Sequence, residues 1–158
     1  MLGRPFHGGF GLINNCGIPK PNFYAFKLLS RLYPQRLDLS YKSSGDVECA
    51  AFTDGEKLQI LVYSQSMDYT KNDETKIQLE INFAAKAVMA QYIDDAHCNP
   101  KKEWLQMGAP DILRPAQITE IQSRTSLTKE SIPFTAEHGH TQIALTLRTN
   151  DIVLLSLS

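Results

Sequence analysis

The stretch TKIQLEINF, residues 75–83, alternates strictly between polar and apolar side chains. Successive side chains of an extended strand point to opposite faces, so this pattern gathers every apolar group of the stretch on one face. A strand of this kind needs an apolar layer on one side only, as in an antiparallel sheet with one solvated face. The stretch therefore predicts a half-buried antiparallel strand with Ile77, Leu79, Ile81 and Phe83 facing inward.

The same two-residue period recurs on both sides of this stretch. VECAAFT and KLQILVYS flank Asp54-Gly55, a dipeptide typical of hairpin turns, and AKAVMAQYID follows as the expected neighbour of residues 75–83. Near the end, TQIALTLR alternates again, and DIVLLSLS is apolar enough for a central strand. About seven strands with turn signals between them predict a mainly β fold, an antiparallel β-sandwich. Its expected shared core adds Ile143, Leu145, Leu147 and Leu154 to the four residues above.

An amphipathic helix is expected before the strands, from Phe23 to Tyr33. Asn22 can cap its first turn, and Pro34 ends the pattern because proline cannot continue the hydrogen-bond ladder. A single apolar face, which must pack against a partner surface, is formed by Ala25, Leu28, Leu29 and Leu32.

A short two-helix insertion is expected between the strands, at about residues 99–124. Asn99 can cap its first helix, with Pro100 at the first helical position and Gly108 just past the end. A second short helix is expected to begin at Pro115. The insertion therefore separates one group of strands from the next.

Composition excludes several function classes. The 158 residues are enough for one domain with a real core, and the net charge of −1 gives no footprint for nucleic acid or an acidic membrane. No apolar run approaches a bilayer span, and because no basic-then-apolar stretch follows Met1, no signal peptide is expected in this sequence. The odd number and wide spacing of Cys16, Cys49 and Cys98 favour buried or idle thiols. We expect a soluble chain without cofactor, in a compartment left open between cytoplasmic and periplasmic or secreted.

One cluster of potential metal ligands stands out, in the stretch IDDAHCNP. It offers Asp94, Asp95, His97 and Cys98 within five positions. No second cluster has comparable spacing, so a loop that hydrogen-bonds its own backbone is the favoured interpretation and no metal is predicted. His138 and His140, on either side of Gly139, are expected to be exposed residues of a turn between strands.

The uncharged stretch PFHGGFGLIN, residues 5–14, carries three of the nine glycines. Taken alone it predicts a tight turn that needs positive φ angles. Together with the following NCGIPKPNFYAFKLLSRL, however, it resembles the segment after the last barrel strand in the β-xylosidases of glycoside hydrolase family thirty-nine. YIDDAHCNPKKEWLQMGAP resembles that family's later IDEEHGNP…W…MG.P stretch, and QITEIQ and DIVLLSL also have counterparts, so the resemblance spans nearly the whole chain.

The resemblance implies a fold and a division of the chain. The family combines a (β/α)₈ barrel with a β-sandwich, and barrel enzymes place their sites in the βα loops. Residues 1–35 would then be a loop and helix left over from the barrel, and residues 36–158 the C-terminal sandwich domain. The loop would lie close to the sugar in the full-length parent, through Phe6, His7, Gly8, Gly9 and Phe10.

The resemblance also implies what the chain lacks. Retaining glycosidases need two carboxylates about 5 Å apart, and the family's two catalytic glutamates lie upstream of anything matched here. We therefore expect an inactive C-terminal fragment that has no catalytic residue of its own. Its expected partner is the barrel of the parent, through which it would meet xylosides or xylo-oligosaccharides. The alternative is a stand-alone carbohydrate-binding sandwich. Self-association is expected through an exposed helix face or an unpaired strand edge.

Overall fold

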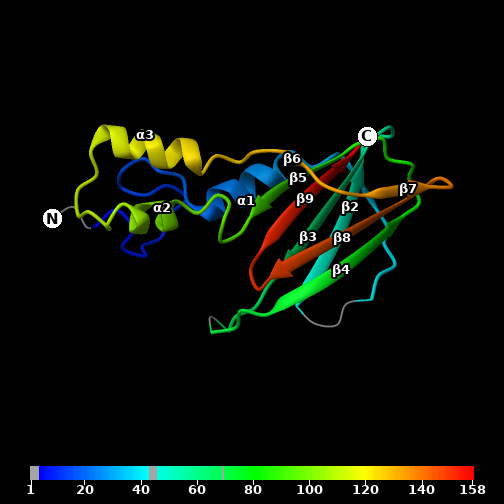
Figure 1. The fold of residues 1–158 in the computed structure, drawn as a ribbon, viewed down its shortest axis with the longest axis horizontal. Coiled ribbons are helices and arrows are strands. Elements are labelled where there is room, and N and C mark those ends of the chain that lie inside the picture. The colour runs from blue at the N-terminus through cyan, green and yellow to red at the C-terminus, as the bar shows by residue number, and fades with distance from the viewer. Residues whose placement is uncertain (1–3, 43–45, 69) are drawn as a thin grey trace. The chain divides into compact units, whose positions relative to one another are not determined.

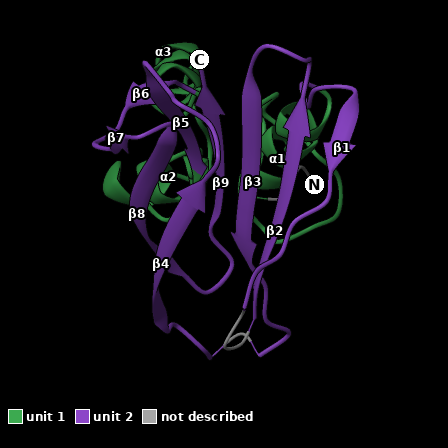
Figure 2. Cartoon of the chain, turned by 90° about the vertical axis from the view of Figure 1, so that its right-hand side faces the viewer, with its two compact units in different colours: residues 1–30, 93–127 green, residues 31–92, 128–158 purple. Residues whose placement is uncertain are grey.

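The computed structural model describes residues 4–42, 46–68 and 70–158 (Figure 1). The described residues form nine strands and three helices. They divide into two compact units, coloured separately in Figure 2. Unit 1 combines residues 1–30 with 93–127, and unit 2 combines residues 31–92 with 128–158. No helix among the described residues is long and apolar enough to cross a membrane.

Unit 2 is built from two sheets. The larger sheet has the order β1-β2-β3-β9-β5-β6, with bounds Gln35–Leu37, Val47–Thr53, Leu58–Ser64, Ile152–Leu157, Val88–Ile93 and Glu130–Ser131. The smaller sheet has the order β4-β8-β7, with bounds Glu74–Ile81, His140–Arg148 and Thr135–Glu137. One apolar cluster joins side chains from both sheets, among them Ile60 and Val153 with Ile143 and Leu147. The predicted antiparallel β-sandwich is therefore confirmed.

The predicted hairpin and the alternating strand are present. β2 and β3 coincide with the stretches on either side of Asp54-Gly55 and pair from Thr53↔Leu58 onward. Four residues close the turn: Gly55 has a φ of 99°, and the Asp54 carboxylate accepts hydrogen bonds from the amides of Glu56 and Lys57. Those bonds lower the pKa of Asp54.

The expected neighbour of the alternating strand was wrong. β4 pairs with β8 over eight residues, from Glu74↔Arg148 to Ile81↔Thr141, and not with β5. After residue 81 the chain crosses to the larger sheet, where β5 lies between β9 and β6. β5 is buried on both faces, in contrast to β4, whose side chains alternate. Strands that follow one another in the sequence are usually neighbours in a sheet, which favoured β5 as the partner. β4 instead pairs with β8, whose side chains alternate between buried and exposed as those of β4 do.

The sandwich core confirms most of the expected members and corrects one. Ile143, Leu145 and Leu147 are buried, and half-buried Ile77, Leu79, Ile81 and Phe83 pack against the same cluster. Leu154 is buried but lies outside this cluster, whereas Val153, Leu155 and Leu157 belong to it. An almost uniformly apolar strand such as β9 gives no alternation from which its inward face can be predicted.

Unit 1 holds the three helices, α1 Pro21–Leu29, α2 Pro100–Gln106 and α3 Pro115–Arg124. α2 and α3 confirm the predicted insertion: the Asn99 side chain accepts from the Lys102 amide, and Gly108 has a φ of 85°. A second apolar cluster in this unit contains Ile18, Trp104, Leu113 and Ile121. An ion pair from Arg124 on α3 to Glu103 on α2 ties the two helices, and Arg124 also pairs with Glu120 one turn earlier on α3.

The bounds and the apolar face of α1 differ from the prediction. The helix begins at Pro21 and ends at Leu29, where Ser30 caps it, so it stops well before Pro34. Its buried side chains are Tyr24 and Leu28, while Phe26 and Leu29 are exposed. The aromatic ring of Tyr24 takes the inward position that the aliphatic pattern had assigned to Leu29. Burial raises the pKa of the Tyr24 hydroxyl.

We expect Leu155→Ala to lower the free energy of unfolding by about 2–5 kcal/mol, because a fully buried leucine leaves a cavity when truncated. Leu79→Ala removes the same atoms from a half-buried position on the edge strand β4, so its loss should be smaller. Urea titration of both variants measures the difference. An equal or larger loss for Leu79→Ala would contradict the core described above.

Candidate functional site

A pocket of about 290 Å³ lies in unit 1 beside the glycine-rich loop. Its walls come from residues 5–10, 13–15, 20–21 and 99–101. All five residues predicted to lie near a sugar are among them, namely Phe6, His7, Gly8, Gly9 and Phe10. The pocket thus brings the N-terminal loop together with the start of α2, which the sequence separates by about ninety residues.

The three side chains of this group have different surroundings. Phe6 is half-buried and packs against the Trp104 ring, with 5.4 Å between the ring centroids. His7 is exposed, and Phe10 is the most exposed large apolar residue among those described. Phe6 therefore anchors the loop to the core of unit 1, while His7 and Phe10 are available to contact a ligand.

The two adjacent glycines are required by the shape of the loop. Gly8 has a φ of 81°, in the left-handed region that side chains disfavour. The amide of Gly9 donates to His7 Nδ1 at 3.2 Å, and a Cβ on Gly9 would overlap the His7 ring. The close approach of the imidazole to the backbone thus depends on a glycine at position 9. The turn predicted from the sequence is present, with His7 folded over it.

Asn14 holds the base of the loop through both ends of its side chain. Its Oδ1 accepts from the amides of Cys16 and Ile18, both at 2.9 Å, and its Nδ2 donates to the Pro5 carbonyl at 3.0 Å. An asparagine can satisfy backbone groups on two sides at once because it carries both an acceptor and a donor. Asn14 therefore closes the loop on itself.

Lys20 holds the outer part of the same loop. Its ammonium group donates to the carbonyls of Gly9 and Phe10, at 2.6 and 3.2 Å. Two backbone carbonyls that would otherwise face solvent are fixed by one charged donor, and charge-assisted hydrogen bonds are the stronger kind. Gln122 on α3 adds a third tether, from Nε2 to the Gly17 carbonyl at 3.0 Å.

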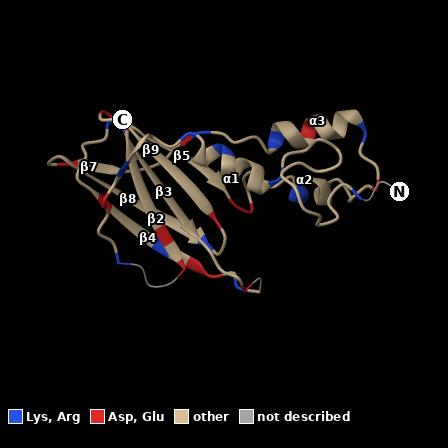
Figure 3. Ribbon diagram, turned by 180° about the vertical axis from the view of Figure 1, so that it is seen from behind, with Lys and Arg blue, Asp and Glu red and all other residues tan. Residues whose placement is uncertain are grey.

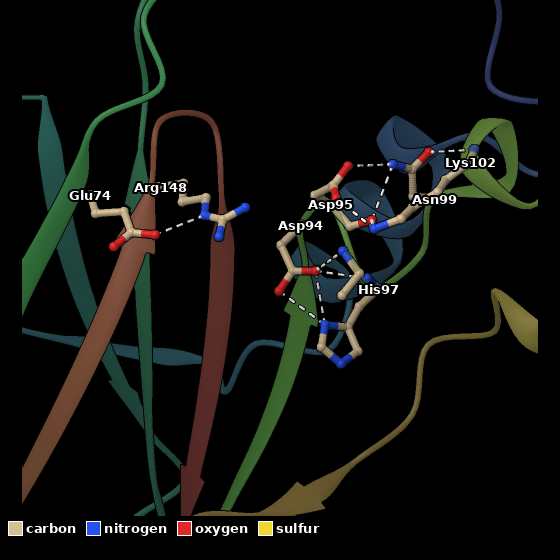
Figure 4. Close-up of polar contacts among 8 residues, drawn as sticks. Glu74, Asp94, Asp95, His97, Asn99, Lys102 and Arg148 are labelled. Carbon is tan, nitrogen blue, oxygen red and sulfur yellow. Dashed lines mark hydrogen bonds and ion pairs between the residues drawn. The ribbon is translucent and has the colours of Figure 1, made fainter.

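The acidic stretch before α2 forms a loop that binds its own backbone. Asp94 Oδ1 accepts from the amides of Ala96 and His97 at 2.7 Å, and both carboxylate oxygens contact His97 Nδ1 (Figure 4). Asp95 pairs with Lys102 at 2.6 Å. This is the loop interpretation that the sequence favoured for IDDAHCNP. The described residues contain no group of three metal-ligating side chains.

The side chains that line the pocket include two aromatic rings, amides and basic groups. Among the described residues that line it, the ionisable side chains are His7, Lys20 and Lys101, and none is a carboxylate. Glycoside hydrolysis with retention needs an acid and a nucleophile, both carboxyl groups in most families. What the pocket offers is an exposed aromatic ring, an imidazole and loop backbone groups, a surface suited to a hydroxylated ligand.

Two residues that position the loop were missed in the sequence analysis, Asn14 and Lys20. Asn14 lies shortly before Gly17, and an asparagine close to a glycine is a typical turn signal that could have been used. Lys20 lies between two prolines, and nothing local indicates that its ammonium reaches back to residues 9 and 10. His138 and His140 are exposed at the β7–β8 turn in unit 2, as expected.

We expect Asn14→Ala to loosen the loop without unfolding unit 1. Each lost hydrogen bond contributes about 1 kcal/mol, so the amides of Cys16 and Ile18 should exchange with deuterium roughly fivefold faster. The control is Asn15→Ala, which changes the exposed neighbouring side chain. Unchanged exchange at both amides in Asn14→Ala, or equal acceleration in the control, would contradict the role given to Asn14.

The thiols offer a second test. Burial, aided by the Asp94 carboxylate, raises the pKa of Cys98 to about 12, and burial raises the pKa of Cys49 to about 11. Since only the thiolate reacts, we expect both residues to resist iodoacetamide at pH 8 in the native protein and to be labelled rapidly in denaturant. Mass spectrometry of peptides follows each site. Native labelling as fast as that of the unfolded chain would contradict the packing around them.

Comparisons with known proteins agree with the family resemblance found in the sequence. The profile of the family described as "Glycosyl hydrolases family 39" matches residues 3–142. A β-xylosidase of Caldicellulosiruptor saccharolyticus is 32% identical over 133 residues, covering 82% of this chain and 27% of that protein. A β-xylosidase of Geobacillus stearothermophilus is 26% identical over 165 residues, covering 96% of this chain and 29% of that protein.

A solved structure supports the same assignment. The GH39 enzyme of Xanthomonas axonopodis pv. citri superposes with a TM-score of 0.73 at 26% identity, over 98% of this chain and 33% of that enzyme. The chain thus spans less than a third of the length of the two curated β-xylosidases. Because the family profile covers most of its residues, the chain belongs to family 39 of the glycosyl hydrolases.

Proposed function

We propose that this chain is the C-terminal, non-catalytic portion of a larger family 39 glycosidase that hydrolyses β-xylosides. The curated relatives are β-xylosidases more than three times its length. The observation that carries the proposal is the pocket at the glycine-rich loop, which has aromatic and backbone groups but no carboxylate among its described lining residues. Such a site can border a sugar while the acid and the nucleophile come from elsewhere.

The proposal gives two parts of the chain different tasks. Residues 1–35 would be the last loop and helix of a catalytic barrel, and the sandwich of unit 2 would brace that barrel. The exposed apolar side chains Phe26 and Leu29 on α1 support a docking role for this helix, since a water-exposed pair on a short helix is stabilised by a partner surface. The same two side chains could also mediate self-association of the isolated chain.

Within the larger protein, the loop would form one wall of the xyloside site. Phe10 and His7 are exposed and would contact the sugar, because an aromatic ring can cover the apolar face of a pyranose. Phe6 would not contact the sugar itself but would hold the loop in place by packing against Trp104. Gly8 and Gly9 would let the backbone approach the ligand closely.

A stand-alone carbohydrate-binding sandwich is the alternative, and the position of Trp104 disfavours it. Binding modules of this kind present exposed aromatic platforms, whereas Trp104 is buried in unit 1 and its indole N–H donates to the Pro110 carbonyl at 3.0 Å. Calorimetry of the chain with xylobiose separates the two functions. Binding of xylobiose with a Kd in the micromolar range would favour the alternative.

A chimera tests the proposal directly. Replacing the matched stretch of the Caldicellulosiruptor saccharolyticus β-xylosidase with this chain should leave an enzyme that still hydrolyses nitrophenyl xyloside. In that background, Phe10→Ala should raise KM by roughly tenfold, which corresponds to losing one aromatic contact of about 1.4 kcal/mol.

The control in the chimera is Met67→Ala, which truncates an exposed apolar side chain that belongs to unit 2 and not to the loop. We expect it to leave KM unchanged. A folded but inactive chimera would contradict the bracing role, and an unchanged KM in Phe10→Ala would contradict the sugar-proximal role of the loop. Thermal melting of each variant verifies that the protein is folded.

A further inference from the structure

The smaller sheet of unit 2 ends in an unpaired strand. Its order is β4-β8-β7, so β4 has a partner on one side only among the described residues. On the inward face of β4, Ile77, Leu79 and Ile81 pack against the core but remain half-exposed. An eight-residue edge that offers free backbone groups beside apolar side chains is a template for a further strand.

A groove runs beside this edge. It has a volume of about 750 Å³ and is lined by residues 37–42, by residues of β2 and β3 that include Ala51 and Ile60, and by Gln78 to Phe83 of β4 and the turn after it. Leu37, Leu79 and Phe83 are among its apolar lining residues. The groove therefore leaves room along the open edge of β4, where another extended segment can lie.

Charged residues of both signs lie along β4 (Figure 3), and Glu74, Lys76 and Glu80 alternate with its half-buried side chains. Glu74 is already paired with Arg148 of β8, at 3.1 Å (Figure 4). Lys76 and Glu80 are exposed, and neither has an ion-pair partner among the described residues. They lie on the same face, two positions on either side of Gln78. The strand thus presents a symmetric pattern of one cation and one anion about a neutral centre.

We propose that a second copy of this chain pairs with β4 through its own β4, antiparallel and centred on Gln78. In this register Lys76 lies opposite Glu80 of the second copy, and Glu80 lies opposite its Lys76. On the inward face, Ile77 lies opposite Leu79 of the second copy. The two smaller sheets join into one continuous sheet, which removes the open edge from both copies.

The charges select this register over its neighbours. A shift of two residues in one direction places Glu74 opposite Glu80, and a shift in the other direction places Lys76 opposite Asn82. A shift of one residue turns the apolar side chains of one copy outward. Exposed ion pairs contribute little affinity, so backbone pairing and apolar burial hold the dimer while Lys76 and Glu80 determine its alignment.

This inference is independent of the proposed function. It concerns the edge of unit 2, whereas the proposed sugar contact and barrel docking use the loop and α1 of unit 1. Its test needs only the purified chain and its mass in solution, so its failure would leave the chimera experiment unaffected.

Charge reversal supplies the experiment. Sedimentation equilibrium over a wide concentration range should show the 17.7 kDa chain approaching twice its mass. Lys76→Glu and Glu80→Lys should each weaken association by about tenfold, because each places two like-charged pairs across the dimer. The double variant Lys76→Glu/Glu80→Lys should recover the affinity of the original chain. An equimolar mixture of the two single variants should associate more tightly than either alone, since every cross-strand pair is then opposite in charge.

The control is Lys129→Glu, the same charge change at an exposed position of unit 2 outside β4, which should leave the dimer intact. Four results would overturn the proposal. The first is a monomeric mass at the highest concentration, and the second is a loss of affinity in the control equal to that in Lys76→Glu. The third is a double variant that does not recover the original affinity. The fourth is a dimer whose affinity is unchanged by Lys76→Glu but which is lost in Phe26→Ser.

Discussion

The structure depends on one constraint, the need to cover the apolar face of alternating strands. β4 and β8 place Ile77, Leu79, Ile143, Leu145 and Leu147 on one face over an eight-residue ladder, and that face is stable only against the inner face of the larger sheet. Register follows from the same need, because a one-residue slip would expose the whole set. The constraint also explains what is left over. Because the smaller sheet ends at β4, the apolar side chains of this strand are only half-buried. The same strand has an open edge that another strand can join.

Unit 1 is held together by a different kind of interaction. Its glycine-rich loop has almost no regular secondary structure, and three polar side chains, Asn14, Lys20 and Gln122, satisfy its backbone groups. Phe6 then fixes the loop to Trp104. A loop tethered in this way can present His7 and Phe10 to a ligand with little freedom, as a binding wall requires. The unit therefore combines a backbone tethered by side chains with exposed side chains at His7 and Phe10, which is the arrangement that the proposed sugar contact needs.

The sequence predicted what local pattern determines and missed what distant contacts determine. The bounds of β2 and β3 and the caps of α2 followed from period, turn residues and Asn99, each of which acts within a few positions. The pairing of β4 with β8 joins residues more than sixty positions apart, and no local signal selects it over the sequential neighbour. Leu154 was assigned to the wrong face of β9 because a uniformly apolar strand has no alternation that shows which residues face the shared core. At the site, the resemblance pointed to residues 6–10, which line the pocket of unit 1, but the tethers from Asn14 and Lys20 depend on how the chain folds back on itself.

The central claim is that this chain contributes structure and substrate contact to a family 39 glycosidase without the groups that break the glycosidic bond. The most direct test is to measure release of nitrophenol from nitrophenyl β-xyloside by the purified chain alone, against a buffer blank. The account predicts no release above the blank at any pH at which the chain is folded, because the pocket at the loop has no carboxylate among its described lining residues. Release well above the blank that persists through repurification at constant specific activity would contradict it.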